Sequence, residues 1–309
     1  MKPIVVLGVF VADTAYRADR QPKMGETILG NSFSLGPGGK GSNQAVAIGK
    51  LNAPVHMLTR LGRDDFADMA MNTWKAAGVT PEVIWTPESY TGAAYIFLEE
   101  ATGNNAIIVC PGAARLISPS DIEANRKLIE GASIFITQLE QPINTAECAL
   151  GIAKRAGVTT ILNTAPAAPL PDSIFALCDY MTPNETEVED MTGVKVVTLE
   201  DAKAAANALL ARGVGTAVIT LGERGALIHN HKISEIVPIY KVGPVVETTG
   251  AGDAFNGGFA VGLARGLSPV EAAKFGCAVA GISVTRKGTA PAMPSLNEAE
   301  TLFGAKLPA

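Results

Sequence analysis

This 309-residue sequence has no excess of positive charge, no closely spaced cysteines and no long apolar run. Its 25 Lys and Arg residues are outnumbered by 30 Asp and Glu residues, which gives a net charge of −5. A nucleic-acid-binding protein usually carries a basic patch or a high pI, so this balance argues against that class. It does not exclude a phosphate-bearing ligand, because helix N-termini and backbone N–H groups bind anions locally.

The four cysteines lie far apart and form no Cys-x-x-Cys pair. Each lies in or beside an apolar run, which favours buried free thiols over a disulfide or a metal site. They are Cys110, Cys148, Cys178 and Cys277.

No apolar run approaches the ~18 residues that a membrane span needs. The run at residues 4–12 is β-branched and is closed by Asp13, with no small-residue cleavage site after it. It therefore predicts a buried first strand rather than a signal peptide. We expect a cytoplasmic protein without a membrane partner.

What the sequence does contain is an alternation of strand-like and helical segments from about residue 107 onward. Residues 134–138, 159–163 and 217–221 are typical of strands, and residues 144–156 and 198–212 of helices. Such alternation predicts an α/β fold, in which helices cover both faces of a mostly parallel sheet within a single domain, residues 1–309. Ligands bind such sheets at the carboxyl ends of the strands, so motifs that follow strands carry extra weight.

Two early segments, at residues 14–35 and 90–105, interrupt this alternation. Both are β-rich and separated by turns, without helical periodicity. They are too small to form a core of their own. We therefore expect a lid over the site of the main domain, with a surface that could bind a second subunit.

The strongest local motif is the segment ETTGAGDAF at residues 247–255. Its glycines open a predicted helix at 254–265, where free N–H groups and the helix dipole suit phosphoryl oxygens. Asp253 beside such a site has two interpretations. It is either a plain N-cap on a glycine-rich turn, or a base that accepts a proton from a hydroxyl as that oxygen attacks phosphorus.

A second glycine-rich segment, GPGGKGSNQ at residues 36–44, precedes a predicted helix at 45–50. It fails the phosphate-loop pattern because Ser34 stands where the first glycine belongs and Gly41 follows Lys40. Close backbone approach at Gly39, with Lys40 and Asn43 as polar groups, suits a polyhydroxylated ligand. The alternative is an ordinary loop between strand and helix.

Two further segments follow predicted strands. In the segment NETE at residues 184–187, helix capping alone explains Glu187, although a carboxylate there could also order Mg²⁺ through water. The segment TLGERG at residues 220–225 indicates only a turn.

Together these segments resemble the ribokinase family of sugar kinases, in the family's order and over almost the whole chain. The segments GGKGSNQA at 38–45 and ETTGAGD at 247–253 match its two main motifs, and 184–187, 220–222 and 284–288 match further blocks. The resemblance implies a three-layer α/β/α domain with a small β-sheet lid that often forms a dimer clasp. It also implies transfer of the γ-phosphoryl group of ATP to a sugar hydroxymethyl, with Mg²⁺ and a monovalent cation, usually K⁺.

The resemblance also implies residue roles. Asp253 would be the base, and the N–H groups of Gly250, Ala251 and Gly252 would form the anion hole. The sugar would be held by Asp13, Gly39, Lys40, Asn43 and Glu140. The nucleotide would be lined by Asn184, Thr220, Gly222, Gly225, Gly252 and Cys277, with Glu187 supporting Mg²⁺. The K⁺ ligands would come from Glu247, Thr249, Ser283, Arg286 and Gly288, with Ala292 where a serine ligand is common and Glu247 where an aspartate is frequent.

One departure bears on the substrate. Ribokinases typically have Asn two residues before the sugar-binding aspartate, and this chain has Val11 there. Valine cannot hydrogen-bond a hydroxyl, so 2-deoxyribose stands close behind ribose as the expected sugar. The same motifs would also suit a nucleoside kinase or a catalytically silent sugar sensor, although a pure sensor has no need of Asp253.

Overall fold

The computed structural model describes residues 1–308. Two sheets are present in this range, one of nine strands and one of four. The strands are β1 (Ile4–Leu7), β2 (Val11–Ala18), β3 (Ser32–Gly38), β4 (Val55–Leu61), β5 (Val79–Trp85), β6 (Thr91–Glu99), β7 (Asn105–Gly112), β8 (Ile134–Thr137), β9 (Thr159–Leu162), β10 (Tyr180–Met181), β11 (Thr216–Thr220), β12 (Ala226–His229) and β13 (Ser234–Val237). The α-helices are α1 (Lys40–Lys50), α2 (Asp65–Ala77), α3 (Pro119–Ala124), α4 (Arg126–Glu130), α5 (Ile143–Arg155), α6 (Asp172–Phe175), α7 (Glu185–Thr192), α8 (Leu199–Ala211), α9 (Ala251–Ala264), α10 (Pro269–Ser283) and α11 (Leu296–Phe303), with short 3-10 helices at Ala113–Leu116, Gly222–Arg224 and Ala290–Ala292.

The large sheet has the strand order β13-β12-β11-β10-β9-β8-β1-β4-β5. From β11 to β5 all neighbours pair in parallel, and the two antiparallel pairings, β11 with β12 and β12 with β13, lie at one edge. The burial of strand β1 on both faces explains why its sequence is a continuous apolar run. Ile4 and Val6 enter one hydrophobic core, and Val5 enters the other. A strand buried on both faces has no polar side, as expected for a parallel sheet between two helical layers.

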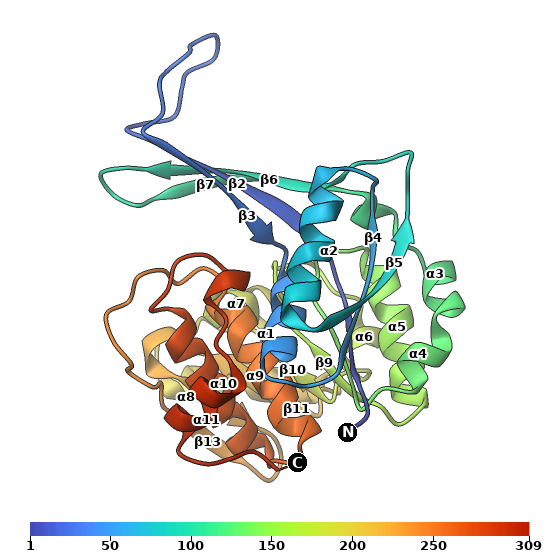
Figure 1. Cartoon of the computed structure of the whole chain (residues 1–309). Coiled ribbons are helices and arrows are strands. Elements are labelled where there is room, and N and C mark those ends of the chain that lie inside the picture. The colour runs from blue at the N-terminus through green and yellow to red at the C-terminus, as the bar shows by residue number, and fades with distance from the viewer. Residues whose placement is uncertain (309) are drawn as a thin grey trace.

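Each face of the large sheet is covered by its own set of helices (Figure 1). One core contains buried residues of α1, α2, α9, α10 and α11, and the other contains buried residues of α3 to α8. The predicted three-layer α/β/α fold is therefore confirmed. The expected capping of α8 is also present, because Thr198 accepts the N–H of Asp201 and the Asp201 carboxylate accepts the N–H of Thr198.

The predicted single strand at residues 4–12 is wrong in extent. Strand β1 ends at Leu7, and the chain leaves the large sheet to enter the small one as β2. The break lies at Gly8, where a Cβ would lie 2.5 Å from Oε1 of Gln138 and 2.6 Å from Cα of Gly41. A glycine is needed because β1 and α1 come into close contact at this point.

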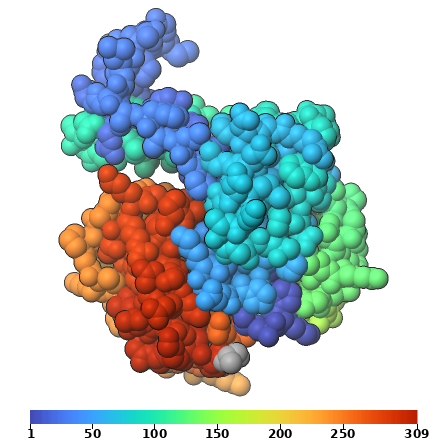
Figure 2. All heavy atoms as spheres, viewed as in Figure 1, coloured from blue at the N-terminus to red at the C-terminus, as the bar shows by residue number. Residues whose placement is uncertain are grey.

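The small sheet is the lid, with the strand order β3-β2-β6-β7. Both predicted segments, 14–35 and 90–105, lie in it, and its strands extend further, to Gly38 and Gly112. Figure 1 shows the lid projecting from the body, with the connection between β2 and β3 reaching furthest out. In Figure 2 the lid overhangs the C-terminal part of the chain and leaves an open recess below it. The lid is thus placed to cover the carboxyl ends of the main strands.

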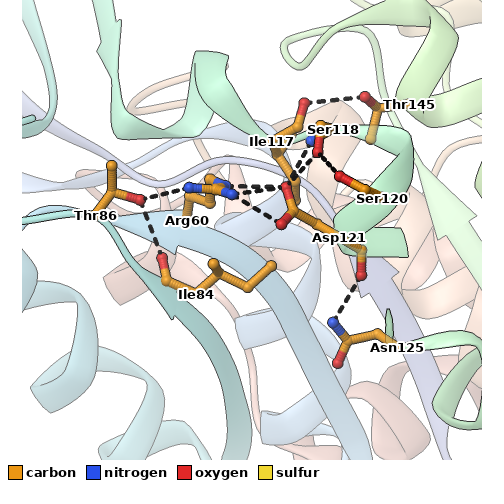
Figure 3. Close-up of polar contacts among 9 residues, drawn as sticks. All are labelled: Arg60, Ile84, Thr86, Ile117, Ser118, Ser120, Asp121, Asn125 and Thr145. Atoms are coloured by element: carbon orange, nitrogen blue, oxygen red, sulfur yellow. Dashed lines mark hydrogen bonds and ion pairs between the residues drawn. The ribbon is translucent and has the colours of Figure 1, made fainter. Parts of the chain in front are cut away.

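The β6–β7 hairpin is flanked by polar contacts with β4 and with the start of α2. The Asp64 carboxylate caps α2 through the N–H of Ala67 at 2.8 Å and accepts the N–H of Thr91, the first residue of β6, at 2.7 Å. Past β7, Arg60 forms a forked ion pair with Asp121 at 2.8–3.0 Å (Figure 3). Paired forks of this kind are rigid. The lid therefore has a fixed base on the main domain.

Among residues 1–308 no helix is both long and apolar enough to cross a membrane. All four cysteines are free, as predicted. The expectation that all are buried holds for Cys178 and Cys277, but Cys148 is only half-buried and Cys110 is exposed. Its apolar run forms β7, an edge strand of the lid rather than a strand of the core.

Candidate active site

Helix α1 begins at Lys40, five residues earlier than predicted, so the polar residues of the first glycine-rich segment are helical. Gly39 precedes the helix with φ of 89°, and a Cβ there would lie 2.5 Å from the carbonyl oxygen of Val9. No side chain of this segment caps the helix. The cap comes from Glu140, whose carboxylate accepts the N–H of Lys40 at 2.8 Å. Glu140 thereby fixes the end of the glycine-rich loop.

Helix α9 begins at Ala251 rather than at residue 254, with Gly250 as its N-cap at φ of 80°. Asp253 is thus the third residue of the helix and does not act as its cap. Its carboxylate accepts a hydrogen bond from Nδ2 of Asn43 at 2.9 Å and another from Nε2 of Gln44 at 3.1 Å. The side chain is 5% exposed. The two glycine-rich segments, far apart in sequence, therefore meet at Asp253.

The N-terminus of α9 leaves backbone donors available. The N–H of Ala251 donates to the carbonyl of Thr248 at 3.1 Å, so it is engaged within the turn. The N–H of Gly252 has no acceptor among the described residues. Such a donor at a helix start can receive a phosphoryl oxygen.

Three carboxylates converge in this site. Burial, together with Asp253 and Glu247, raises the pKa of Asp13 to about 6. Burial raises the pKa of Glu140 to about 7, although Lys40 opposes the shift. Burial also raises the pKa of Asp253, and Lys40 with the two amide donors opposes it. Lys40 is therefore the cation that balances this acidic site.

Two details of the site suit a polyhydroxylated ligand. The Oδ1 atom of Asn43 is buried and has no hydrogen-bond partner in residues 1–308, so it remains available to accept from a hydroxyl. At Gly38 a Cβ would lie 2.2 Å from Oδ2 of Asp13, so only glycine leaves the Asp13 carboxylate its present position. An acceptor and a carboxylate that both need donors match a sugar's hydroxyls.

Four of the residues predicted for the nucleotide lie at or just after the ends of β10 and β11, whereas Gly252 lies on α9 and Cys277 on α10. Asn184 and Thr220 form an isolated parallel bridge, and Gly222 and Gly225 adopt positive φ angles of 53° and 92°. Cys277 lies in the hydrophobic core, and burial raises the pKa of its thiol to about 12.

The capping interpretation of residues 184–187 is borne out. Asn184 and Glu187 form a reciprocal capping box on α7. Both Glu187 oxygens are occupied, because Oε1 also accepts from Nδ2 of Asn184 at 2.9 Å. Burial raises the pKa of Glu187, and Lys40 and Asp253 are close enough to influence it.

The segment predicted to bind the monovalent cation is tied together at several points. Oε2 of Glu247 accepts the N–H of Gly288 at 2.8 Å, and Thr289 donates to the carbonyl of Pro37 at 2.9 Å, which links the segment to the lid. The side chains of Ser283 and Arg286 bond to Ala280 and Glu298. Thr249 and Ala292 complete the predicted set, with Ala292 buried.

Several polar residues at the site have no predicted role. Gln44 belongs to the first glycine-rich segment, so its presence was visible in sequence, but its bond to Asp253 was not. Gln138 and Asn163 follow strand-like runs at the carboxyl edge of the sheet, which is the signal that could have found them. Both form hydrogen bonds with Gln44, at 2.7 and 3.1 Å.

Comparison with known proteins agrees with this geometry. The sequence pattern of the pfkB family carbohydrate kinases matches residues 1–296. The chain belongs to this family. It is 37% identical to a deoxyribokinase from Salmonella typhi over 96% of each chain, and 36% identical to a ribokinase from Haemophilus influenzae over 96% of this chain and 97% of the relative. The structure of Arabidopsis thaliana ribokinase complexed with ribose and ATP superposes with a TM-score of 0.91 at 31% identity and covers 98% of both chains.

Membership of the pfkB family confirms the prediction of an ATP-dependent sugar kinase. The sensor hypothesis loses its basis, because the family is one of kinases and Asp253 is present. The choice of sugar is not decided by these relatives, since a deoxyribokinase and several ribokinases match at 36–38% identity.

The raised pKa of Glu140 in this pfkB-family kinase predicts a pH-dependent stability. Its folded-state pKa of about 7 lies above the ordinary value of 4.5, so its contribution is present below pH 4.5 and is lost as the pH rises through about 7. The Glu140→Gln variant still has an oxygen to accept the N–H of Lys40 but does not titrate. We expect it to melt above the wild type at pH 8 by at least ~2 °C, and we expect the difference to shrink to nothing as the pH falls below 4.5, as measured by calorimetry. A difference independent of pH would contradict this account.

Proposed function

We propose that this chain transfers the γ-phosphoryl group of ATP to the hydroxymethyl oxygen of D-ribose, which yields ribose 5-phosphate and ADP. The supporting observation is the place of Asp253, which touches the sugar-side helix through Asn43 and lies one residue after the free N–H of Gly252. A base at this junction can accept the hydroxyl proton while the helix N-terminus stabilises the phosphoryl oxygens. Asp253 then acts on the sugar hydroxyl, and the N–H donors act on the phosphoryl group of ATP.

The remaining residue roles are part of the same proposal. The sugar is held by Asp13, Gly39, Lys40, Asn43 and Glu140. The nucleotide is bound by Asn184, Thr220, Gly222, Gly225, Gly252 and Cys277. The anion hole is formed by the N–H groups of Gly250, Ala251 and Gly252, with Ala251 required to exchange its bond to Thr248 for one to the ligand.

We also propose that the reaction uses Mg²⁺ and K⁺. Within residues 1–308 no group of three or more His, Cys, Asp or Glu side chains is arranged to hold a metal. Mg²⁺ keeps most of its water and takes its other ligands from phosphates, so Glu187 would act through water. For K⁺, the tie between Glu247 and Gly288 brings together the two segments whose carbonyls would be ligands. Turnover that is unchanged when K⁺ is replaced by Li⁺ would argue against the K⁺ site.

The second candidate substrate is 2-deoxyribose, and the surroundings of Val11 favour it. Val11 lies two residues before Asp13 in β2, so both side chains are on one face of the lid. Val11 is buried in an apolar cluster with Val9, Ala94 and Ala114. A sugar hydroxyl aimed at this cluster would be left without a partner, at a cost of ~1–3 kcal/mol.

The test is a coupled ADP-release assay with Mg-ATP and K⁺ on D-ribose, 2-deoxy-D-ribose, D-fructose and adenosine. We expect turnover with the two pentoses, and a kcat/KM ratio that moves toward ribose by roughly 5- to 150-fold in the Val11→Asn variant. An unchanged ratio would mean that Val11 does not face the sugar. No turnover with any of the four would contradict the proposed substrate class.

We further propose a cytoplasmic homodimer joined through the outer face of the lid. Tyr16 on this face lies 5.1 Å from the ring of Phe33 and 5.4 Å from that of Tyr95, and Tyr16 and Phe33 are both exposed. Ile108 is exposed on the same face, opposite Tyr95. Exposed apolar patches of this kind mark interaction surfaces. Sedimentation at monomer mass, or at dimer mass in a Phe33→Glu variant, would contradict the proposal.

A further inference from the structure

A closed ring of hydrogen bonds lies beneath the candidate active site. The ring is formed by Gln44, Asn163, Thr182, Asn256 and the Gly252–Asp253 pair. Gln44 donates to Asp253 and to Oδ1 of Asn163, both at 3.1 Å. Asn163 donates to the carbonyl of Thr182 at 3.0 Å, and the Thr182 hydroxyl donates to Asn256 at 2.7 Å. Asn256 donates to the carbonyl of Gly252 at 2.8 Å, which closes the ring at the residue before Asp253.

The carbonyl of Thr182 determines which group donates and which accepts in the hydrogen bonds that Gln44 makes. The carbonyl of Thr182 can only accept, so Asn163 must present its NH₂ group there and its oxygen to Gln44. Gln44 must then present its NH₂ group to Asn163 and, with the second hydrogen, to Asp253. The assignment of the Gln44 amide is thus determined by its surroundings.

Gln138 fixes the other end of the Gln44 amide. Its Nε2 donates to Oε1 of Gln44 at 2.7 Å, so a rotation of Gln44 would place two NH₂ groups face to face. Gln44 and Gln138 are both fully buried. A rotated Gln44 would also turn its oxygen toward the Asp253 carboxylate and toward Oδ1 of Asn163, which disfavours the rotated state. Oε1 of Gln138 is buried and has no hydrogen-bond partner in residues 1–308.

Asn43 and Gln44 differ in whether a hydrogen-bonding atom of the amide remains unused. Both amides donate to the Asp253 carboxylate, but Oδ1 of Asn43 has no hydrogen-bond partner in residues 1–308. Asn43 can therefore bind a ligand, whereas every polar atom of Gln44 is already used within the protein. Gln44 can therefore act on the reaction only through its hydrogen bond to Asp253.

We propose that Gln44 is a positioning residue for phosphoryl transfer: held by Gln138 and Asn163, it orients the Asp253 carboxylate and favours its charged form. The inference rests on the proposed role of Asp253 as the base. A hydrogen bond to a carboxylate stabilises the ionised state, and a fixed rotamer keeps the base aligned with the hydroxyl. Because its polar atoms are used within the protein, we expect Gln44 itself to contact neither substrate.

Other charged groups also interact electrostatically with the residues of this site. They are Lys40 on α1, Asp13 on β2, Glu140 after β8 and Glu187 on α7. All remain in a Gln44 variant, so the difference between the pH profiles of variant and wild type isolates residue 44. Measurement of kcat at saturating sugar and ATP removes the titrations that affect only binding.

The experiment compares Gln44→Met, which removes the donor, with Gln44→Glu, which also places a second carboxylate beside Asp253. We expect kcat to fall on the order of 10- to 100-fold in both. The acid limb of kcat should move upward by about 1–2 pH units in Gln44→Met, because a bond to a charged group is lost. It should move further in Gln44→Glu, where two carboxylates share a site.

The matched control is Gln141→Met, another buried glutamine, which donates to Thr137 and to the carbonyl of Gln138 and has no bond to Asp253. It should lose stability in thermal melts without moving the acid limb. Folded Gln44 variants whose acid limb stays in place would overturn the positioning role. An Asp253→Asn variant that keeps its turnover would instead overturn the proposed base, so the two failures are distinguishable.

Discussion

Replacement of Asp253 by asparagine is expected to lower kcat by roughly 10²- to 10⁴-fold, the usual contribution of a general base. Asparagine keeps the shape of the side chain but cannot take a proton from the sugar hydroxyl. Affinity for the sugar should change only a few-fold, because the other sugar-side groups on α1 and β2 remain. The loss should therefore appear in kcat and not in KM, as expected for an interaction that acts in the transition state.

The structure also predicts a side effect of this variant. Asn43 and Gln44 both donate to Asp253, so an asparagine would turn one NH₂ group toward a donor. The mismatch should cost ~1–3 kcal/mol of stability. The required measurements are single-turnover kinetics with ATP, calorimetric titration with the sugar and a thermal melt. A folded variant that binds sugar and keeps kcat within tenfold of the wild type would show that the base lies elsewhere.

Local patterns predicted the fold well where the determining residues are neighbours in sequence. The Thr198 and Asp201 pair set the start of α8 at the expected position, and strand-like runs of β-branched residues gave β8, β9 and β11 to within one residue. Of the boundaries that were wrong, those of α1 and β1 have causes that are distant in sequence. Helix α1 starts at Lys40 because Glu140, 100 residues away, accepts its first N–H. Strand β1 stops at Gly8 because α1 and Gln138 come close to it.

In the candidate site, too, local motifs were predictable from the sequence and contacts between distant residues were not. Its glycines, Lys40, Asn43 and Asp253 lie in two motifs that the sequence displays. Gln44 lies in the first motif too, yet its partner Asp253 is 209 residues away, and nothing local distinguishes an amide that orients a carboxylate from a polar residue on an exposed helix. The exposure of Cys110 was missed for a related reason, because an apolar run on a lid strand has the same composition as a core strand.

The Gly38→Ala variant is expected to raise KM for the sugar by roughly 10- to 150-fold with little change in stability. A Cβ at Gly38 would lie 2.2–2.5 Å from the three atoms of the Asp13 carboxyl group. That group is the end of a flexible side chain, so it can swing away without disturbing the backbone. The site then loses a hydrogen bond to a charged group, which is worth ~1.5–3 kcal/mol. The matched control is Gly36→Ala in the same strand, where an added Cβ would meet nothing within 4 Å.

A double-mutant cycle decides whether the effect of Gly38→Ala passes through Asp13. If the methyl group acts only by displacing that carboxylate, then Gly38→Ala should add almost nothing in an Asp13→Ala background, and the two changes should be strongly non-additive in sugar binding. Additive effects would mean that the methyl group disturbs the strand or the neighbouring Gly39 turn directly. Because Gly36→Ala reports on the strand alone, non-additivity together with a silent control would assign the sugar-binding loss to the Asp13 carboxylate.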